Sequence, residues 1–149
     1  TVTSEGRPQA RTVVLRAADK RAGTLDVYTD LGSAKVKDMR AAPFAALHVW
    51  DRSAHLQLRL EADVTILIGR DVATIWEGVP PTSRLSYGVT PAPGQPISRA
   101  LDYTKVSDAG SFAVLRLEIS AVDALHLGPN HRRARFDRES DWIGTWLVP

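Results

Sequence analysis

A strict alternation of apolar and polar residues in the middle of the chain constrains its fold most. The segment Leu56–Glu61 reads Leu-Gln-Leu-Arg-Leu-Glu and lies within a longer apolar run over residues 55–67. Successive side chains of a β-strand point to opposite faces, so this period of two predicts a long strand with one apolar and one polar face. The centre of the fold is therefore expected to be a β-sheet.

Further β-branched and apolar runs predict strands on both sides of this segment. We expect them at residues 10–16, 24–29, 44–50, 111–119, 122–127 and 131–138, with a closing segment at residues 142–148. Helical signals are short. Ser33 stands at an N-cap position before residues 34–41, Pro43 ends that helix, and the apolar period lengthens at residues 69–76.

These elements predict a mainly β protein with about seven or eight strands, largely antiparallel, and two or three short helices. Five of the nine prolines lie between residues 80 and 96, so we expect an irregular connection there with at most one short helix. Strand-rich chains of this length close into a barrel or a sandwich, which removes exposed sheet edges. Periodicity alone does not choose between the two.

Composition adds limits on the class of protein. The 149 residues fit one domain over residues 1–149, and the chain contains no cysteine for disulfides or thiolate ligands. Its four histidines lack metal-ligand spacing, so no metal site is expected. No apolar run approaches the roughly 18 residues of a membrane-spanning helix, and a formal net charge of +2 does not indicate a nucleic-acid partner. We expect a soluble, cytoplasmic protein.

One candidate anion site follows the first predicted hairpin. Arg11 begins the first strand, Thr29 ends the second, and Lys35 lies in the first turn of the helix after Ser33. The free N–H groups and the dipole of a helix N-terminus favour an anion, so these residues together predict a phosphate site. The alternative is that Arg11 and Lys35 are ordinary surface charges.

A basic stripe lies on the predicted strand 131–138. His131, Arg133 and Arg135 share one face of that strand, which suits a phosphate, a carboxylate or a ring carbonyl. RNA is a further possibility, but acidic residues follow directly and oppose it. The alternative is a solvated edge strand, where basic residues block unwanted pairing.

Gln57 stands alone among leucines on the polar side of the central strand. An amide both donates and accepts hydrogen bonds, which suits the pyrimidine edge of a flavin or a nucleobase. The alternative is a solvent-facing glutamine. The four tryptophans are typical anchors of a core or a dimer interface.

Taken in order, several segments resemble the pyridoxamine 5′-phosphate oxidase family over residues from about 8 to 149. They are Arg11-Thr12-Val13-Val14-Leu15-Arg16, Tyr28-Thr29-Asp30, Ser33-Ala34-Lys35, Leu56-Gln57, the proline-rich loop, Arg135 with Trp142, and the terminal Leu147-Val148-Pro149. The resemblance implies a split β-barrel that binds FMN at the interface of a homodimer.

The resemblance also implies the residues of the site. The expected FMN-binding residues are Arg11, Thr12, Val13, Val14, Leu15, Tyr28, Thr29, Ser33, Lys35, Gln57, Gln95, His126 and Arg135. Arg11 and Lys35, helped by Thr29, would hold the phosphate, and the backbone of residues 13–15 would face the flavin ring. Gln57 would lie on the polar side of that ring, and Arg135 matches the family's C-terminal arginine. Arg16 and Arg133 are expected to bind an anionic substrate, and no catalytic acid or base is identified.

The chain departs from the family at positions that bear on its activity. Ser33-Ala34-Lys35 lacks the middle arginine of the phosphate motif, His126 stands for a tryptophan, and His131-Arg132-Arg133 replaces the substrate-reading Arg-Leu-His. Val79 or Pro80 stands where the family has an arginine that grips the vitamin phosphate. We therefore expect an FMN-dependent oxidoreductase of unassigned substrate, without true pyridoxamine 5′-phosphate oxidase activity. The alternative is a flavin-binding or flavin-storage protein with little turnover.

Overall fold

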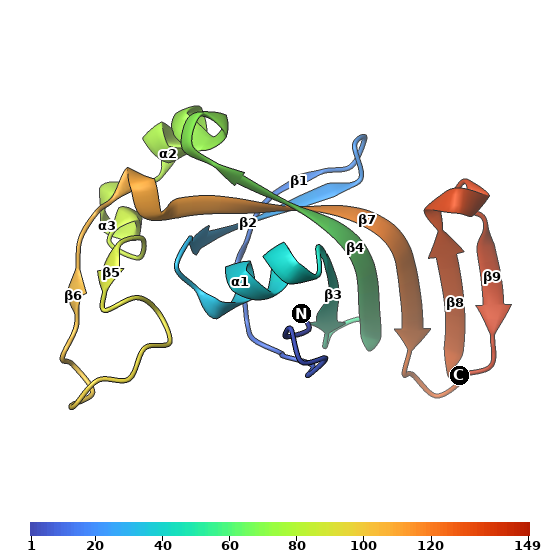
Figure 1. Cartoon of the computed structure of the whole chain (residues 1–149). Helices are drawn as coiled ribbons and strands as arrows, with labels where there is room; N and C mark the ends of the chain where they lie inside the picture. Colours follow the sequence, from blue (N-terminus) through green and yellow to red (C-terminus); the bar gives the residue numbers. More distant parts are fainter.

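The computed structural model describes residues 1–149 and is built around a seven-stranded antiparallel sheet (Figure 1). Its strands are β1 (Leu15–Asp19), β2 (Thr24–Asp30), β3 (Phe44–Asp51), β4 (Leu56–Ile68), β7 (Phe112–His126), β8 (Arg132–Asp137) and β9 (Gly144–Leu147). Two short strands, β5 (Val89–Thr90) and β6 (Thr104–Lys105), pair separately. The prediction of a mainly β fold is confirmed.

Three short helices accompany the sheet. They are α1 (Ala34–Ala41), α2 (Ala73–Gly78) and α3 (Pro81–Arg84), with 3-10 turns at Gly69–Val72, Ala109–Ser111 and Arg138–Ser140. No helix is long and apolar enough to cross a membrane. Helix α1 has the predicted bounds, but the Ser33 side chain makes no capping hydrogen bond. The Ser33 hydroxyl lies instead beside the hydroxyl of Thr29 and the amine of Lys35.

Strand β7 is the spine of the sheet. It pairs with β4 along one side, and along the other side it pairs first with β2 and then with β8. The two strands predicted at residues 111–119 and 122–127 are therefore one strand. Ile119 faces Ala62 and Ala121 faces Glu61, which leaves Ser120 as the extra residue of a β-bulge. The predicted division into two strands was wrong because a bulge interrupts side-chain alternation without ending the strand.

A second bulge shapes the first hairpin. Leu15 faces Val27 and Ala17 faces Asp26, so Arg16 is the extra residue on β1. The predicted strand at residues 10–16 begins only at Leu15, since residues 10–14 have no partner strand in this chain. The prediction of a buried strand was wrong for residues 10–14, which are exposed, because pairing requires a neighbouring strand that this chain does not supply there.

Two apolar clusters hold the elements together. In the larger one, Val36 and Met39 of α1 pack against the concave face of the sheet, on residues such as Leu115 of β7 (Figure 1). The smaller one lies at the opposite end from β8 and β9 and centres on Phe112, whose ring is fully buried. It fixes the positions of Tyr28 and Tyr87, which lie 5.3 Å and 4.9 Å from the Phe112 ring.

Candidate functional site

A cavity of about 320 Å³ opens beside the first hairpin and α1. Its lining comes from β1 and the segment before it, from β2 and α1, and from the connections after α3 and after β5. The lining residues are Thr12, Val13, Val14, Arg16, Tyr28, Thr29, Asp30, Ser33, Lys35, Ser86, Tyr87 and Pro93. The structure thus brings together most of the N-terminal residues that sequence analysis assigned to the cofactor.

Lys35 is the polar centre of this cavity. Its Nζ donates to Oγ1 of Thr29 at 3.0 Å and to Oγ of Ser33 at 3.2 Å. Partial burial lowers the pKa of Lys35, and the positive charge of Arg11 lowers it further, while Asp30 acts in the opposite direction. The positive charges of Lys35 and Arg11 thus repel each other at a partly buried position, and a bound anion would stabilise both.

Asp30 is a carboxylate in the lining of the same cavity, but its oxygens are already engaged. The backbone N–H of Gly32 donates to Oδ1 at 2.7 Å, and that of Gly88 donates to Oδ2 at 2.8 Å. Asp30 therefore connects the loop after α3 to the end of β2, and two backbone N–H groups stabilise its negative charge.

Arg11 lies at the edge of this cluster and is held by α1. Its Nη1 donates to Oγ1 of Thr1 at 2.7 Å, and its Nη2 lies 3.5 Å from Oδ2 of Asp38, a buried carboxylate. The long ion-pair distance leaves donors of the guanidinium free for another acceptor.

The backbone of residues 11–14 is unpaired. None of these residues belongs to a strand, and none takes part in a backbone–backbone hydrogen bond within the chain. Backbone N–H and C=O groups that are buried are almost always hydrogen-bonded to a partner. A ligand in this cavity would find unused backbone donors and acceptors along one wall.

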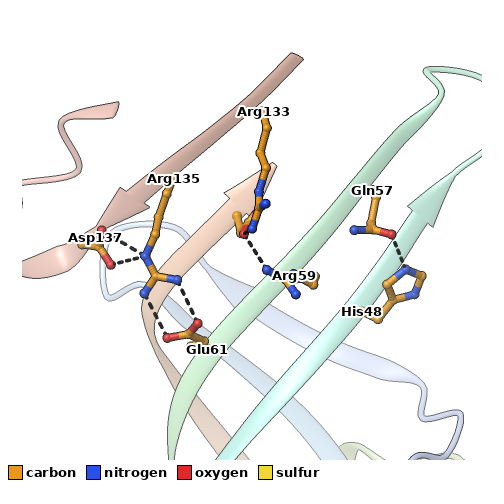
Figure 2. Close-up of polar contacts among 8 residues, drawn as sticks. His48, Gln57, Arg59, Glu61, Arg133, Arg135 and Asp137 are labelled. Carbon is orange, nitrogen blue, oxygen red and sulfur yellow. Dashed lines mark hydrogen bonds and ion pairs between the residues drawn. The ribbon is translucent and has the colours of Figure 1, made fainter. Parts of the chain in front are cut away.

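A second group of predicted residues lies around the C-terminal half of β7. Oε1 of Gln57 lies 3.4 Å from Nε2 of His48 (Figure 2). His126, predicted as a cofactor residue, ends β7, and its Nδ1 accepts from the backbone N–H of Gly128 at 3.4 Å. These residues are far from the cavity around Lys35.

The two predicted arginines of β8 are each paired with carboxylates of their own chain (Figure 2). Arg135 binds Glu61 through two hydrogen bonds of 2.9 Å and 3.1 Å, and its Nε donates to Asp137. These contacts raise the pKa of Arg135, mainly through Glu61, and lower that of Glu61.

Arg133 is bound in the same way to Asp123, a buried residue of β7. Its Nε and Nη2 donate to the two carboxylate oxygens at 3.1 Å and 2.7 Å, and Arg59 adds a third bond of 2.6 Å. Arg133, followed by Arg59, lowers the pKa of Asp123 to about 2. Arg133 is therefore already committed to a carboxylate, whereas Arg16 makes no ion pair.

The spacing along β7 separates the two groups. Thr29 faces Ala113, whereas Gln57 faces Leu125, twelve residues further along the strand. At about 3.3 Å per residue this is roughly 40 Å along β7. One chain therefore does not bring Gln57, His126 and Arg135 to the cavity that contains Lys35.

Other predicted residues lie outside the cavity lining, and some lining residues were not predicted. Leu15 begins β1 and Gln95 lies in the loop near Pro93, but neither lines the cavity. Ser86, Tyr87 and Pro93 do line it and were missed. They lie within the proline-rich connection, where no periodic pattern signals which side chain faces inward.

Comparison with known proteins gives a consistent result. Residues 1–68 match the family model of the pyridoxamine 5′-phosphate oxidase FMN-binding domain. A pyridoxine/pyridoxamine 5′-phosphate oxidase 2 of Arabidopsis thaliana is 30% identical over 148 residues, which covers 89% of this chain and 73% of that protein. A pyridoxine/pyridoxamine 5′-phosphate oxidase of Xanthomonas euvesicatoria pv. vesicatoria is 43% identical over 70 residues, covering 45% of this chain and 34% of the relative.

Solved structures agree in fold. A pyridoxamine 5′-phosphate oxidase-related, FMN-binding protein of Nostoc punctiforme superposes with a TM-score of 0.80 at 26% identity, over 100% of this chain and 85% of that one. PhzG of Burkholderia lata superposes with a TM-score of 0.80 at 20% identity, over 100% of this chain and 79% of that one. The expected split-barrel fold and the FMN cofactor are thereby confirmed. The chain belongs to the pyridoxamine 5′-phosphate oxidase-like family of FMN-binding proteins.

Proposed function

We propose that this chain is a single FMN-binding domain that acts, as a homodimer, as an FMN-dependent oxidoreductase on a small anionic substrate. The observation that carries this proposal is the cluster of Lys35, Thr29 and Ser33 beside an unpaired stretch of backbone. It combines the donors that a phosphate needs with the free main-chain groups that a heteroaromatic ring can use.

The residues that line the cavity, together with Arg11 at its edge, fit FMN. Lys35, Arg11 and the Thr29 hydroxyl would bind the phosphate, and the phosphate would offset the burial and the mutual repulsion that lower the pKa of Lys35. The backbone of residues 12–14 would hydrogen-bond the ring. Bound FMN supplies reversible transfer of electrons to or from an organic substrate. The chain's own contribution is to bind and orient the cofactor and to hold the substrate anion.

The separation of the two groups of residues supports a homodimer. Roughly 40 Å of strand divides the Lys35 cavity from Gln57, and roughly 33 Å divides it from Arg135; both exceed the length of FMN. A second copy that presents its Gln57 and Arg135 to the cavity would complete the site. Exposed apolar side chains favour such burial: Trp50 on the edge strand β3 is 45% exposed, and Trp146 is 75% exposed.

Arg135 is already paired with carboxylates of its own chain. Glu61 engages one N–H of each terminal nitrogen and Asp137 engages the Nε–H, so two of its five N–H donors are left for another acceptor. Its charge is neutralised by these carboxylates, and its assignment to the cofactor stays a prediction.

The substrate side is favoured at Arg16. This guanidinium has no carboxylate partner, lines the Lys35 cavity and lies 6.0 Å from the ring of Tyr28. Arg133, the other candidate, is neutralised by Asp123 at the far end of β7. Arg16, an unpaired cation beside the cofactor's cavity, is therefore the favoured residue to bind an anionic group of the substrate.

The proposal is tested first by the visible absorption spectrum of the purified protein and by titration of FMN into the FMN-free form. We expect flavin absorption and saturable binding that weakens at least about tenfold in Lys35→Met. Lys37→Met, which removes an exposed lysine of the same helix, should bind like the wild type. A purified protein that has no flavin absorption and does not bind added FMN contradicts the proposal. If the protein binds FMN fully but no electron donor reduces the bound FMN, the result would favour the alternative of a flavin-storage protein.

Mixing two defective variants tests the shared site. Lys35→Met and Arg135→Ala each disable a different group, so each homodimer should bind FMN weakly. A mixed dimer would contain one intact site, and FMN binding should return to part of the wild-type capacity. No recovery after subunit exchange would contradict a site that is shared between the two chains.

A further inference from the structure

A second cavity, of about 290 Å³, adjoins the one around Lys35. It lies between the first hairpin and the helices α2 and α3. Its lining residues are Arg16, Tyr28, Thr74, Ile75, Gly78, Val79, Pro80, Ser83 and Tyr87. Arg16, Tyr28 and Tyr87 line both cavities, so a ligand held here would lie next to whatever occupies the first.

Arg16 is placed at this boundary by the β1 bulge. It is the extra residue between Leu15 and Ala17, and a bulge of this kind turns a side chain away from the direction set by strand alternation. The guanidinium lies 6.0 Å from the Tyr28 ring and has no carboxylate partner. It is the one cation in the lining of the second cavity.

The neighbouring arginine is not free to add a second charge. Nε of Arg84 donates to the carbonyl of Val79 at 2.9 Å, its Nη2 donates to the carbonyl of Glu77 at 2.9 Å, and its guanidinium stacks 5.0 Å from the Trp76 ring. Arg84 therefore holds the connection between α2 and α3 in place and forms part of the wall behind the cavity.

The backbone of this connection offers few donors. Pro80 and Pro81 carry no N–H, which removes donors from the start of α3. The N–H of Val79 already donates to the carbonyl of Trp76, and that of Ser83 to the carbonyl of Pro80. An oxyanion in this cavity has one guanidinium and a few side-chain hydroxyls, but no cradle of backbone amides.

The remaining walls are flat and apolar. Tyr28 and Tyr87 are held edge-on against Phe112, and Ile75, Val79 and Pro80 add apolar surface beside the hydroxyls of Thr74 and Ser83. Burial raises the pKa of Tyr87, and the nearby Arg16 acts in the opposite direction. The Tyr87 hydroxyl is thus protonated at neutral pH and can donate a hydrogen bond.

We infer that this cavity binds a planar, mainly apolar monoanion, an aromatic or conjugated cyclic carboxylate, with its carboxylate on Arg16. A phosphate monoester is close to a dianion at neutral pH and is favoured by several cations or amides, which this cavity lacks. Its volume is at the lower end of the usual range for ligand sites, roughly 300–1,000 Å³, and suits one or two rings. The inference rests on the proposed function, since it names the substrate class of the site beside the cofactor.

The test is calorimetric titration of three probes of one shape into the FMN-saturated protein: 2-naphthoate, 2-naphthamide and 2-naphthyl phosphate. We expect 2-naphthoate to bind at least about tenfold more tightly than the amide, and no less tightly than the phosphate. Arg16→Gln should remove the preference for the carboxylate over the amide. Arg21→Gln removes an exposed arginine from the β1–β2 turn and should preserve that preference.

A gain of specificity provides the second arm. Pro80→Arg adds a cation at an exposed position of the cavity lining, so it should raise affinity for 2-naphthyl phosphate about fivefold or more without raising that for the amide. Circular dichroism of each variant confirms that the fold is retained.

Three results overturn the inference: 2-naphthyl phosphate binding more tightly than 2-naphthoate in the wild type, 2-naphthoate displacing FMN, or no binding of 2-naphthoate at all. The same titrations on FMN-free protein separate this inference from the proposed function. A protein that does not bind FMN refutes the proposed function. The carboxylate preference of the second cavity is decided separately, by comparing the affinities of 2-naphthoate and 2-naphthamide.

Discussion

Asp123 is a buried carboxylate clamped between two arginines, and replacing it by asparagine tests how that clamp stabilises the sheet. Arg133 binds both of its oxygens, and Arg59 adds a third contact from the neighbouring strand. Asparagine keeps the shape and some hydrogen bonding but removes the negative charge. The effect should come mainly from Arg133, because the Arg59 side chain is 54% exposed and its ion pair is screened by water.

The magnitude follows from the pKa of Asp123. Lowering it from 3.8 to about 2 on folding contributes about 2.4 kcal/mol to the free energy of unfolding at pH 7. A carboxyl group with a depressed pKa stabilises the folded state above its ordinary pKa, and this stabilisation disappears as the pH falls through the depressed value. The same two pKa values give about 1.3 kcal/mol at pH 3 and about 0.4 kcal/mol at pH 2.

Urea unfolding followed by tryptophan fluorescence, at one protein concentration and several pH values, measures this difference. Asp123→Asn should lower the free energy of unfolding by about 2 kcal/mol at pH 7 and approach the wild type as the pH falls toward 2. Asp63→Asn, an exposed carboxylate of β4 without an ion pair, is the control and should match the wild type. A difference that is the same at pH 7 and pH 3 would refute the electrostatic origin.

Three further predictions concern residues in and around the two cavities. Lys35→Met should raise the melting temperature of the FMN-free protein, because it removes a half-buried charge, while it weakens FMN binding. Phe112→Ala should cost about 3–5 kcal/mol in urea unfolding, since the ring is fully buried among Tyr28, Trp76 and Tyr87, and it should also loosen the second cavity. Gly88→Ala should cost about 1–3 kcal/mol, because φ is +106° and a Cβ would lie 2.5 Å from the carbonyl oxygen of Val106.

Local patterns in the sequence predict most of the sheet and the first helix. The alternation over Leu56–Glu61 is that of a strand with one apolar and one polar face, and this segment is part of β4, which pairs with β3 and β7. Helix α1 has its predicted bounds because a helix of eight residues depends on neighbouring residues and on Pro43 beyond its end. These features are encoded within a few residues of one another, so one sequence is sufficient to see them.

Contacts between distant residues are what the sequence did not reveal. Arg135 and Glu61 are 74 positions apart, and nothing in either segment signals that they pair. The basic stripe of residues 131–135 was read as a surface for an anion, yet Arg133 and Arg135 are neutralised by carboxylates of β4, β7 and β8. Pairing partners of this kind depend on strand register, which a single sequence leaves open.

The two bulges connect the fold to the position of the site. At Ser120 the partner of β7 changes from β2 to β8. The residues around Lys35 therefore lie near the N-terminal end of β7, and Gln57 and Arg135 lie near its C-terminal end. The same extra residue reverses the side-chain alternation, which brings Asp123 to the face where Arg59 and Arg133 bind it. At Arg16 the other bulge turns an unpaired cation toward both cavities. Single extra residues in otherwise regular strands thus decide which arginine is neutralised within the chain and which is left to meet a ligand.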